Sequence, residues 1–155
     1  MHRPYVAVIG PGDATSQESR AAEEIGRALA DAGAVLVCGG LGGVMSAACH
    51  GASDAAGTTV GLLPETDRAS ANEWVQIAIP TGLGELRNGL VIRAADAVIA
   101  VGGAYGTLSE IALALRAGVP VIGLNTWEIE GIERVESAEE AVSRALQRAV
   151  GRGDS

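Results

Sequence analysis

The chain alternates between short, continuous apolar runs and longer stretches in which apolar residues recur every three or four positions. Continuous runs bounded by glycine or proline are typical of strands buried on both faces of a parallel sheet, and the longer spacing is typical of amphipathic helices. The pattern predicts strands over residues 5–9, 34–38, 58–63, 74–79, 96–101 and 119–124. It predicts helices over residues 16–32, 44–56, 84–95, 107–117 and 137–150. Residues 65–73 lack periodicity and are predicted as a loop, and residues 128–135 stay unassigned.

This order of elements predicts an α/β fold, namely a single-domain, doubly wound, Rossmann-like and mostly parallel sheet with helices on both faces. The 155 residues are enough for one ordinary domain. We assign residues 1–150 to this domain and expect residues 151–155 to form a frayed tail. Several predicted helices end in Ala-Gly, and we expect each glycine to take the left-handed conformation that turns the chain back into the sheet. These dipeptides are Ala32-Gly33, Ala56-Gly57 and Ala117-Gly118.

Composition and charge narrow the classes of function. The formal net charge is -8, which argues against nucleic acid and anionic membranes as partners because both are bound by basic surfaces. The 11 basic residues are all arginine. Without lysine, the chain can form neither a Schiff base with pyridoxal phosphate nor a Walker A phosphate loop.

Few residues of the types that bind metals or form disulfides are present. Cys38 and Cys49 lie in apolar surroundings, and we expect two buried, reduced thiols rather than a disulfide scaffold. His2 and His50 have no partners at a spacing typical of metal ligands, so we predict no metal. The first residues lack the apolar stretch of a signal peptide, and no apolar run has the length of a membrane span, so we expect a cytoplasmic protein.

Three glycine-rich turns follow predicted strands, at residues 10–12, 39–43 and 102–106. In a parallel sheet these turns share the carboxyl edge, where ligands bind, and each leads to a helix N-terminus with unpaired N–H groups. One such turn is explained equally well by tight-turn geometry alone, but three together favour an anionic ligand, most simply a phosphate. The candidate ligand-binding residues are Gly10, Gly12, Gly39, Gly40, Gly42, Gly43, Met45, Asn88, Gly102, Gly103, Gly106 and Thr107.

A dinucleotide is a poor match for these turns. The fingerprint G-x-G-x-x-G/A begins well at Gly10-Pro11-Gly12, but residue 15 is threonine. The second strand ends in Cys38 where an acidic residue should bind the ribose. A mononucleotide or another phosphorylated small molecule fits better, so we regard the domain as nucleotide-binding.

Glu110 and Arg87 are the candidate catalytic residues. Glu110 follows the last glycine-rich turn and lies three residues from Thr107, on the same helical face. This spacing also forms a capping box with Thr107 as the N-cap, and the chain has two similar pairs elsewhere, so a capping role remains an alternative for Glu110. Arg87 opens a predicted helix near the same edge, where its guanidinium can bind a phosphate. A solvated arginine paired with Glu85 is the alternative.

Residues 103–110 resemble the P-G-G-x-G-T-x-x-E signature of the Lonely Guy family, which comprises cytokinin riboside 5′-monophosphate phosphoribohydrolases. Arg87 falls where that family has the arginine of its R-K pair. Residues 39–45 look like the family's earlier glycine turn with its methionine. Gly102, Ala104 and Asn88 depart from the pattern, replacing its proline, its second glycine and its lysine. These departures resemble a sister branch that includes the molybdenum cofactor carrier proteins.

The resemblance implies two main hypotheses. The first is a hydrolase that cleaves the N-glycosidic bond of a nucleoside 5′-monophosphate with Glu110 and Arg87 and requires no cofactor. Its phosphate would lie on the N–H groups of Gly103, Gly106 and Thr107. The alternative is a protein that binds the molybdenum cofactor or another phosphorylated ligand without turnover, and a third hypothesis is a nucleotide sensor. The resemblance also implies a homodimer or higher homo-oligomer, with apolar helix faces such as Leu90-Val91, Ile111 and Leu115 at the interface.

Overall fold

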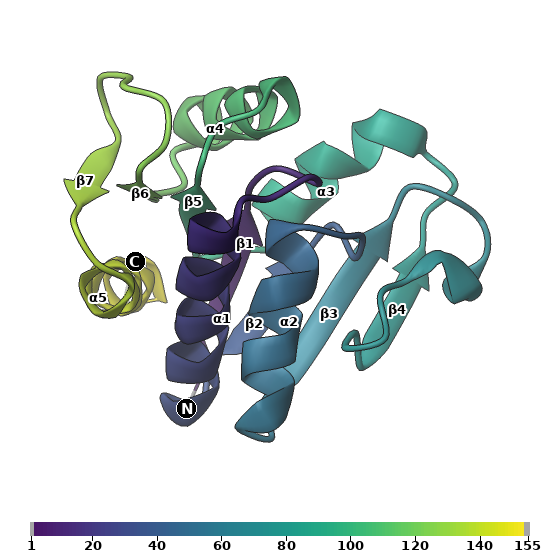
Figure 1. Cartoon of the computed structure of the whole chain (residues 1–155). Coiled ribbons are helices and arrows are strands. Elements are labelled where there is room, and N and C mark those ends of the chain that lie inside the picture. The colour runs from purple at the N-terminus through teal and green to yellow at the C-terminus, as the bar shows by residue number, and fades with distance from the viewer. Residues whose placement is uncertain (1, 154–155) are drawn as a thin grey trace.

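Seven parallel strands form one sheet with helices on both faces in a computed structural model that describes residues 2–153 (Figure 1). The strands are β1 Tyr5–Ile9, β2 Val35–Cys38, β3 Thr58–Leu63, β4 Ile77–Pro80, β5 Ala97–Val101, β6 Val121–Leu124 and β7 Glu133–Val135. The α-helices are α1 Ser16–Asp31, α2 Val44–Asp54, α3 Arg87–Arg93, α4 Tyr105–Ala117 and α5 Ala138–Gly153, and the short 3-10 helices are η1 Arg68–Ser70 and η2 Gly84–Leu86.

The order of the strands is β4-β3-β2-β1-β5-β6-β7, and every neighbouring pair is parallel. The first four strands are therefore added outward from β1, and the chain then returns through α3 to place β5 on the other side of β1. The pairing of Val8 with Ile99 and of Ile9 with Ala100 fixes the register there. Chain direction across the sheet reverses between β1 and β5, and the crevice beyond such a switch point is where doubly wound folds bind ligands. The predicted fold class is confirmed.

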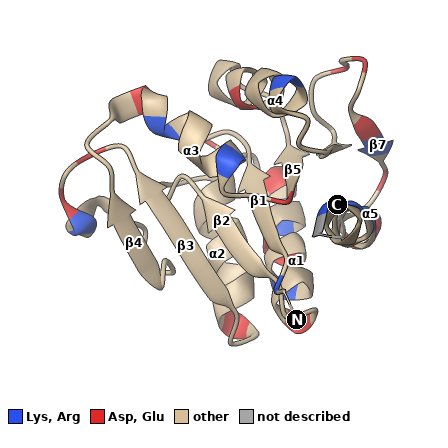
Figure 2. Cartoon of the chain, turned by 180° about the vertical axis from the view of Figure 1, so that it is seen from behind, with Lys and Arg blue, Asp and Glu red and all other residues tan. Residues whose placement is uncertain are grey.

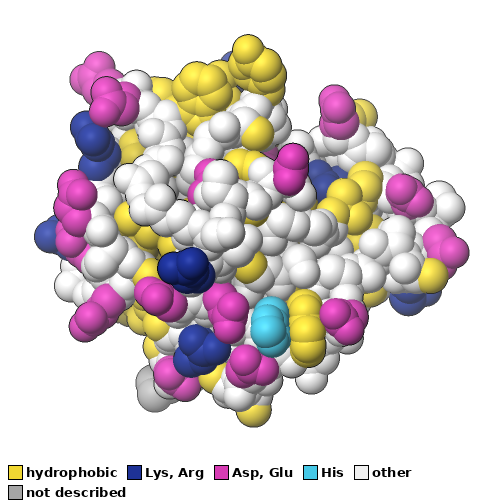
Figure 3. All heavy atoms as spheres, viewed as in Figure 1, with side chains coloured by type: hydrophobic (Ala, Val, Ile, Leu, Met, Phe, Trp, Pro, Cys, Tyr) yellow, Lys and Arg dark blue, Asp and Glu magenta, His cyan; other side chains and the backbone are white. Residues whose placement is uncertain are grey.

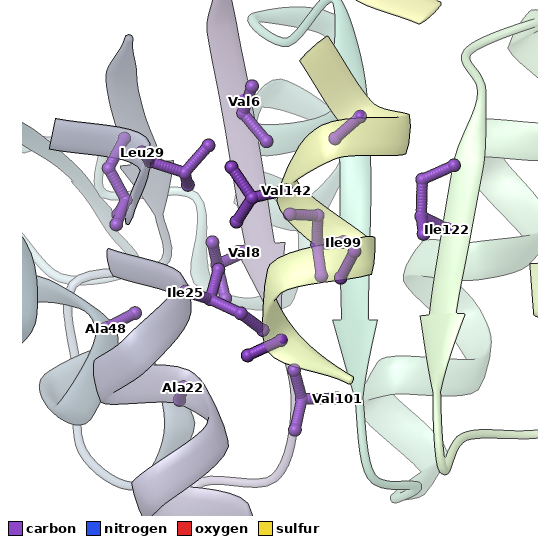
Figure 4. Close-up of a cluster of buried hydrophobic side chains, with 14 of the residues drawn as sticks. Val6, Val8, Ala22, Ile25, Leu29, Ala48, Ile99, Val101, Ile122 and Val142 are labelled. Carbon is purple, nitrogen blue, oxygen red and sulfur yellow. The ribbon is translucent and has the colours of Figure 1, made fainter. Parts of the chain in front are cut away.

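Two apolar clusters cover the two faces of the sheet. One joins β1, β5 and β6 to α1, α2 and α5, and Figure 4 shows side chains from all these elements converging on it. The other joins the opposite faces of β1 and β5 to α3 and α4. Strands β1 to β6 contain no charged residue, whereas the edge strand β7 carries Glu133 and Arg134 (Figure 2). Burial on both faces explains why the central strands appear in the sequence as continuous apolar runs.

Several predicted boundaries differ from the structure. The segment predicted as one helix over 84–95 is divided into η2 and α3, and the strand predicted over 74–79 is formed by residues 77–80. The unassigned segment 128–135 contains β7. Helix α5 continues through residues 151–153, which were expected in a frayed tail, and the rest of that tail, residues 154–155, lies outside the described residues.

The predicted helix ends are correct in two cases of three. Gly33 and Gly118 have φ angles of +77° and +75°, the left-handed conformation expected after α1 and α4. After α2 the residue with positive φ is Ala56, at +57°, and not Gly57. A Cβ atom at Gly57 would collide with Ala30, so glycine is needed there because α1 and the chain leaving α2 approach closely.

Within residues 2–153, no helix is long and apolar enough to span a membrane. Cys38 and Cys49 are buried, free thiols whose Sγ atoms lie 3.5 Å apart. Basic and acidic side chains are interspersed on the face formed by α1 and α2 (Figure 3), so this face presents no continuous basic surface.

Candidate functional site

A cavity of about 230 Å³ lies at the switch point between β1 and β5. The end of β1, all three glycine-rich turns and the first turns of α2, α3 and α4 contribute to its wall. It is lined by Val8, Ile9, Gly10, Pro11, Gly12, Gly39, Met45, Arg87, Asn88, Ala104, Gly106, Thr107 and Glu110. The residues come from four segments that are distant in the sequence. The fold gathers them because parallel strands deliver all their following turns to one edge.

Both candidate catalytic residues and most of the candidate ligand-binding residues line this cavity. The ligand-binding candidates on its wall are Gly10, Gly12, Gly39, Met45, Asn88, Gly106 and Thr107. The candidates that do not line it are Gly40, Gly42, Gly43, Gly102 and Gly103. Pro11 and Ala104 contact the cavity without having been proposed from the sequence, although both stand beside proposed residues.

The glycines after β2 pack against neighbouring backbone. A Cβ atom at Gly40 would lie 2.5 Å from Leu63 Cδ2, so this residue allows the turn to approach β3. A Cβ atom at Gly43 would collide with the backbone of the turn at 10–12, and one at Gly42 would lie 3.6 Å from it. These glycines therefore let two turns meet closely, which places Gly39 and the turn at 10–12 on a common wall.

The glycines after β5 have a similar structural role. Gly102 has a φ of +70°, and a Cβ atom there would collide with the Glu18 carboxylate. A Cβ atom at Gly103 would lie 3.2 Å from the indole nitrogen of Trp127. Both residues shape the β5–α4 turn, whereas the cavity wall begins one residue later, at Ala104.

Helix α4 begins two residues earlier than predicted, and this changes the roles of Thr107 and Glu110. Its N-cap is Ala104, which has no side-chain oxygen, so no side chain caps the first turn. The predicted capping box between Thr107 and Glu110 is therefore wrong, whereas the one formed by Thr15 and Glu18 at α1 is present. Thr107 and Glu110 do share a helical face, and both line the cavity. Glu110 is thus available to a ligand because helix capping does not occupy it.

Arg87 is buried, with 8% of its surface exposed, and the alternative of a solvated arginine paired with Glu85 is wrong. Its Nη2 donates to the Gly39 carbonyl oxygen at 3.4 Å, and its Nη1 donates to the side-chain oxygen of Asn88. Burial lowers the pKa of the Arg87 guanidinium, and the negative charge of Glu110 opposes this change. The guanidinium is held by the glycine-rich turn after β2 and by the neighbouring Asn88, and neither contact uses its Nε.

Glu110 is half-buried on α4 and lines the cavity. Burial raises the pKa of its carboxyl from an ordinary 4.5 to about 7, and the positive charge of Arg87 limits the rise. At neutral pH the carboxyl is therefore present in both protonation states. A group with this pKa can accept or donate a proton near pH 7.

Two residues that line the cavity each have a buried side-chain donor, the Nε of Arg87 and the Oγ1 of Thr107, without a hydrogen-bonding partner among residues 2–153. Thr107 is 1% exposed. Unpaired buried donors cost about 1–3 kcal/mol each and are uncommon in native proteins. Together with the uncapped N–H groups at the start of α4, they form a set of donors that an anion with several oxygens would satisfy.

The sequence likeness to known proteins covers nearly the whole chain. The family model described as the SLOG cluster4 family matches residues 3–150. This chain belongs to the SLOG cluster4 family. An uncharacterized protein of Archaeoglobus fulgidus is 40% identical over 151 residues, which cover 97% of this chain and 99% of that protein.

Solved structures of similar proteins share the fold of this chain over nearly its whole length. The molybdenum cofactor binding protein of the phototrophic bacterium Rippkaea orientalis matches with a TM-score of 0.89 and 35% identity, over 95% of this chain and 98% of that one. The molybdenum cofactor carrier protein of Chlamydomonas reinhardtii matches with a TM-score of 0.87 and 31% identity, over 96% and 99% of the two chains. The sequence predicted that this chain belongs to a Lonely Guy-like sister branch that includes the molybdenum cofactor carriers. That prediction is confirmed.

One cluster of titratable groups in this SLOG cluster4 chain lies on α1 and α2 and does not line the cavity. His50 Nε2 lies 3.6 Å from Asp54 Oδ2, and its Nδ1 lies 4.0 Å from Glu23 Oε2. The statement that His50 lacks partners of the metal-ligating type is therefore wrong, since ligand atoms of these three residues lie within 4.8 Å of one another. Arg27 already pairs with both carboxylates, at 3.1 and 3.5 Å, so the cluster is an ion-pair network between the two helices.

Proposed function

We propose that this protein binds a phosphorylated small molecule in the cavity between β1 and β5, and that this ligand is the molybdenum cofactor. The phosphate occupies the first turn of α4, where it accepts hydrogen bonds from the N–H groups of Gly106 and Thr107 and from the Thr107 hydroxyl. The Nε of Arg87 supplies a charged donor. The molybdenum cofactor is cargo in this proposal, and its release to another protein requires no chemical step.

The observation that carries the proposal is the pair of buried donors without protein partners, Arg87 Nε and Thr107 Oγ1. Their residues line one cavity, whose wall also includes an uncapped helix N-terminus. A helix terminus favours an anion by about 0.3–1 kcal/mol when exposed and by more when enclosed. Each charge-assisted hydrogen bond adds about 1.5–3 kcal/mol. A phosphate is an acceptor with enough oxygens to satisfy all these groups together.

The choice of cofactor rests on the similar proteins, two of which are described as molybdenum cofactor binding or carrier proteins. The molybdenum cofactor is a phosphorylated pterin, so its phosphate matches the donor set. The cavity of about 230 Å³ is smaller than a typical ligand pocket of about 300–1,000 Å³. It therefore encloses the phosphate end, and the ring system extends beyond it.

Retention of the cofactor on a desalting column tests this proposal. The purified protein is mixed with cofactor released from a molybdoenzyme, and the pterin that elutes with the protein is measured by fluorescence after oxidation. We expect stoichiometric retention, and a loss of about 10-fold or more for Thr107→Val because the hydroxyl donor is gone. Retention that Thr107→Val leaves unchanged, or no retention at all, contradicts the proposal.

A second candidate function is hydrolysis of a nucleoside 5′-monophosphate to a free base and ribose 5-phosphate. It is favoured by the placement of Arg87 and Glu110 on the wall of one cavity, with the pKa of Glu110 raised to about 7. Breaking the N-glycosidic bond builds positive charge on the ribose, which ionised Glu110 stabilises while it orients the attacking water. The water adds to the ribose carbon, and its proton goes to the departing base.

A panel of nucleoside 5′-monophosphates distinguishes the two functions. Free base and ribose 5-phosphate are measured by chromatography after incubation with the purified protein. If the protein is a hydrolase, Glu110→Gln lowers the rate by about 100-fold or more, the scale expected for loss of one electrostatic group. Retention of the molybdenum cofactor without release of any base supports the carrier, and base release without cofactor retention supports the hydrolase.

The homo-oligomer implied by the resemblance is proposed to form through an apolar patch on η2, α3 and α4. The patch consists of Leu86, Leu90, Tyr105 and Leu113, which are 78%, 41%, 84% and 40% exposed. Val91 and Ile111, expected at this interface, are instead buried in the core of the chain. A second copy of this chain covers the patch in the proposed assembly. Analytical ultracentrifugation tests it, and Leu86→Glu should reduce the measured mass to that of one chain.

A further inference from the structure

Trp127 lies in the loop between β6 and β7 and contacts the turn that leads into α4. Its indole Nε1 donates to the Ala104 carbonyl oxygen at 3.1 Å. The ring is stacked with Tyr105, with centroids 6.3 Å apart and planes at 26°. A Cβ atom at Gly103 would lie only 3.2 Å from Nε1, so the indole packs directly on that glycine. Three consecutive residues of the turn, 103–105, are therefore held by one side chain that does not itself line the cavity.

The Ala104 carbonyl oxygen connects this turn to helix α4. It also accepts the Leu108 N–H at 3.0 Å, which is the first backbone hydrogen bond of α4. Because Ala104 is the N-cap and has no side-chain acceptor, the geometry of the first turn depends on the backbone and on groups that hold it from outside. Trp127 is such a group. It is itself anchored, because it packs with Ile129 and Ile132 against the apolar core on the α3–α4 face of the sheet.

We infer that Trp127 is a positioning residue that fixes the first turn of α4 in the geometry that accepts the anion. This inference deepens the proposed function and rests on it. The indole keeps the N–H groups of Gly106 and Thr107 directed at the ligand by fixing the carbonyl and the extended backbone of Ala104, whose φ and ψ are -127° and 172°. A ligand binds more tightly to a turn that is already ordered, because ordering it costs conformational entropy on binding.

The first experiment needs no ligand. Trp127→Phe keeps an aromatic ring but removes the N–H donor, and Trp74→Phe is the matched control because Trp74 stacks on His50 and does not line the cavity. Hydrogen exchange of peptides that cover residues 102–108 is measured by mass spectrometry. We expect exchange there to accelerate by about 5-fold in Trp127→Phe, with β1, β5 and α5 unchanged, since one hydrogen bond contributes about 1 kcal/mol. Equal exchange in the two variants overturns the inference.

The second experiment measures the consequence for the ligand, with inorganic phosphate as the probe. In Trp74→Phe the only tryptophan is Trp127, so its emission should change saturably as phosphate fills the first turn of α4. By calorimetry, Trp127→Phe should weaken phosphate binding by about 5-fold relative to Trp74→Phe. Gly103→Ala should weaken it similarly, because the added methyl group displaces the indole.

The outcomes separate the inference from the proposed function. If phosphate binds and its affinity is equal in Trp127→Phe, Gly103→Ala and Trp74→Phe, the positioning role is overturned while the binding proposal stands. If phosphate does not bind the unsubstituted protein, the binding proposal fails, and hydrogen exchange alone decides whether Trp127 orders the turn. If Trp127→Phe lowers the melting temperature strongly and accelerates exchange throughout the sheet, Trp127 has a general structural role and the inference is overturned.

Discussion

Two cavities open at the same carboxyl edge of the sheet, and the smaller one is the better candidate for a ligand site. The larger, about 530 Å³, lies where the N-termini of α1 and α5 meet the ends of β5 and β6. Its helix-capping groups are already paired, since Thr15 and Glu18 bond each other's backbone N–H groups and the Ser137 hydroxyl accepts the N–H of Glu140. The smaller, about 230 Å³, is lined by Arg87 and Thr107, whose buried Nε and Oγ1 have no hydrogen-bonding partner among residues 2–153.

The difference teaches that unpaired buried donors identify a site better than volume does. The larger cavity also carries three carboxylates, Glu18, Glu24 and Glu136, which oppose an anion despite two helix N-termini. An unpaired buried donor is not enough by itself to identify a site, because Thr126 also has an unpaired buried Oγ1. Its surroundings offer only about 40 Å³, room for a water molecule but not for a metabolite. Unpaired donors and adequate space are needed together.

The largest effect is expected from Arg87→Gln, which removes a buried positive charge from the smaller cavity. Adenosine 5′-monophosphate serves as a phosphorylated probe of the cavity, and its binding, measured by calorimetry, should weaken by about 100-fold because a charge-assisted donor is lost. Arg20→Gln is the matched control, since Arg20 lines the larger cavity. An equal loss of affinity in the two variants would mean that the net charge of the protein, and not a specific contact, governs binding. The two cavities would then not differ as ligand sites.

Thr107→Val tests the unpaired hydroxyl without changing side-chain size. Affinity for adenosine 5′-monophosphate should fall by about 10-fold, while the melting temperature of the ligand-free protein stays equal or rises because a buried donor without a partner is removed. Thr126→Val makes the same chemical change outside the cavity and should leave affinity unchanged. A marked fall in the melting temperature of Thr107→Val would show that its hydroxyl serves the fold instead of a ligand.

The pH dependence of binding should report the ionisation of Glu110. Its folded-state pKa of about 7 is above the ordinary 4.5, so its carboxylate becomes charged in the cavity as pH rises through 7 and repels an anion. Between pH 6 and pH 8 we expect a loss of affinity of about 5-fold relative to Glu110→Gln, a comparison that cancels titration of the ligand's own phosphate. Parallel pH profiles for the two proteins would exclude this role for Glu110.

The raised pKa of Glu110 also affects the stability of the folded protein. An acid whose pKa is raised on folding stabilises the folded state most below its unfolded value of 4.5, and that contribution is lost as pH rises to about 7. Glu110→Gln lacks this loss and should gain about 3 °C in melting temperature relative to the unsubstituted protein between pH 5 and pH 8. Thermal unfolding followed by circular dichroism measures it, and a constant difference across this range contradicts the assignment.

The smallest effect on binding is expected at the larger cavity. Thr15→Ala removes the capping box of α1 and should lower the melting temperature by about 2–4 °C, the result of losing about 1 kcal/mol. Affinity for adenosine 5′-monophosphate should not change. A loss of affinity comparable to that of Thr107→Val would mean that both cavities contribute to one ligand site.

The two cavities also differ in how far the sequence anticipated them. The capping box of α1 is local, so the residues at 15 and 18 reveal it directly. At α4 the same local pattern was misleading, because the helix begins at Tyr105 and the position of Ala104 depends on Trp127, which is 23 residues away. The sequence signal at Trp127 was weak, since its segment shows no periodicity.

Local patterns alone determined the order of six of the strands and of the five α-helices, though not β7. They also determined the edge at which the glycine-rich turns meet and the two charged residues placed there, Arg87 and Glu110. They do so because hydrophobic period and turn chemistry act over a few residues. Only the tertiary structure decided which glycines line the cavity and which merely let backbones approach, and that Arg87 is buried against Gly39, 48 residues away. Burial, unpaired donors and the raised pKa of Glu110 arise from contacts between distant segments, and no local pattern encodes those contacts.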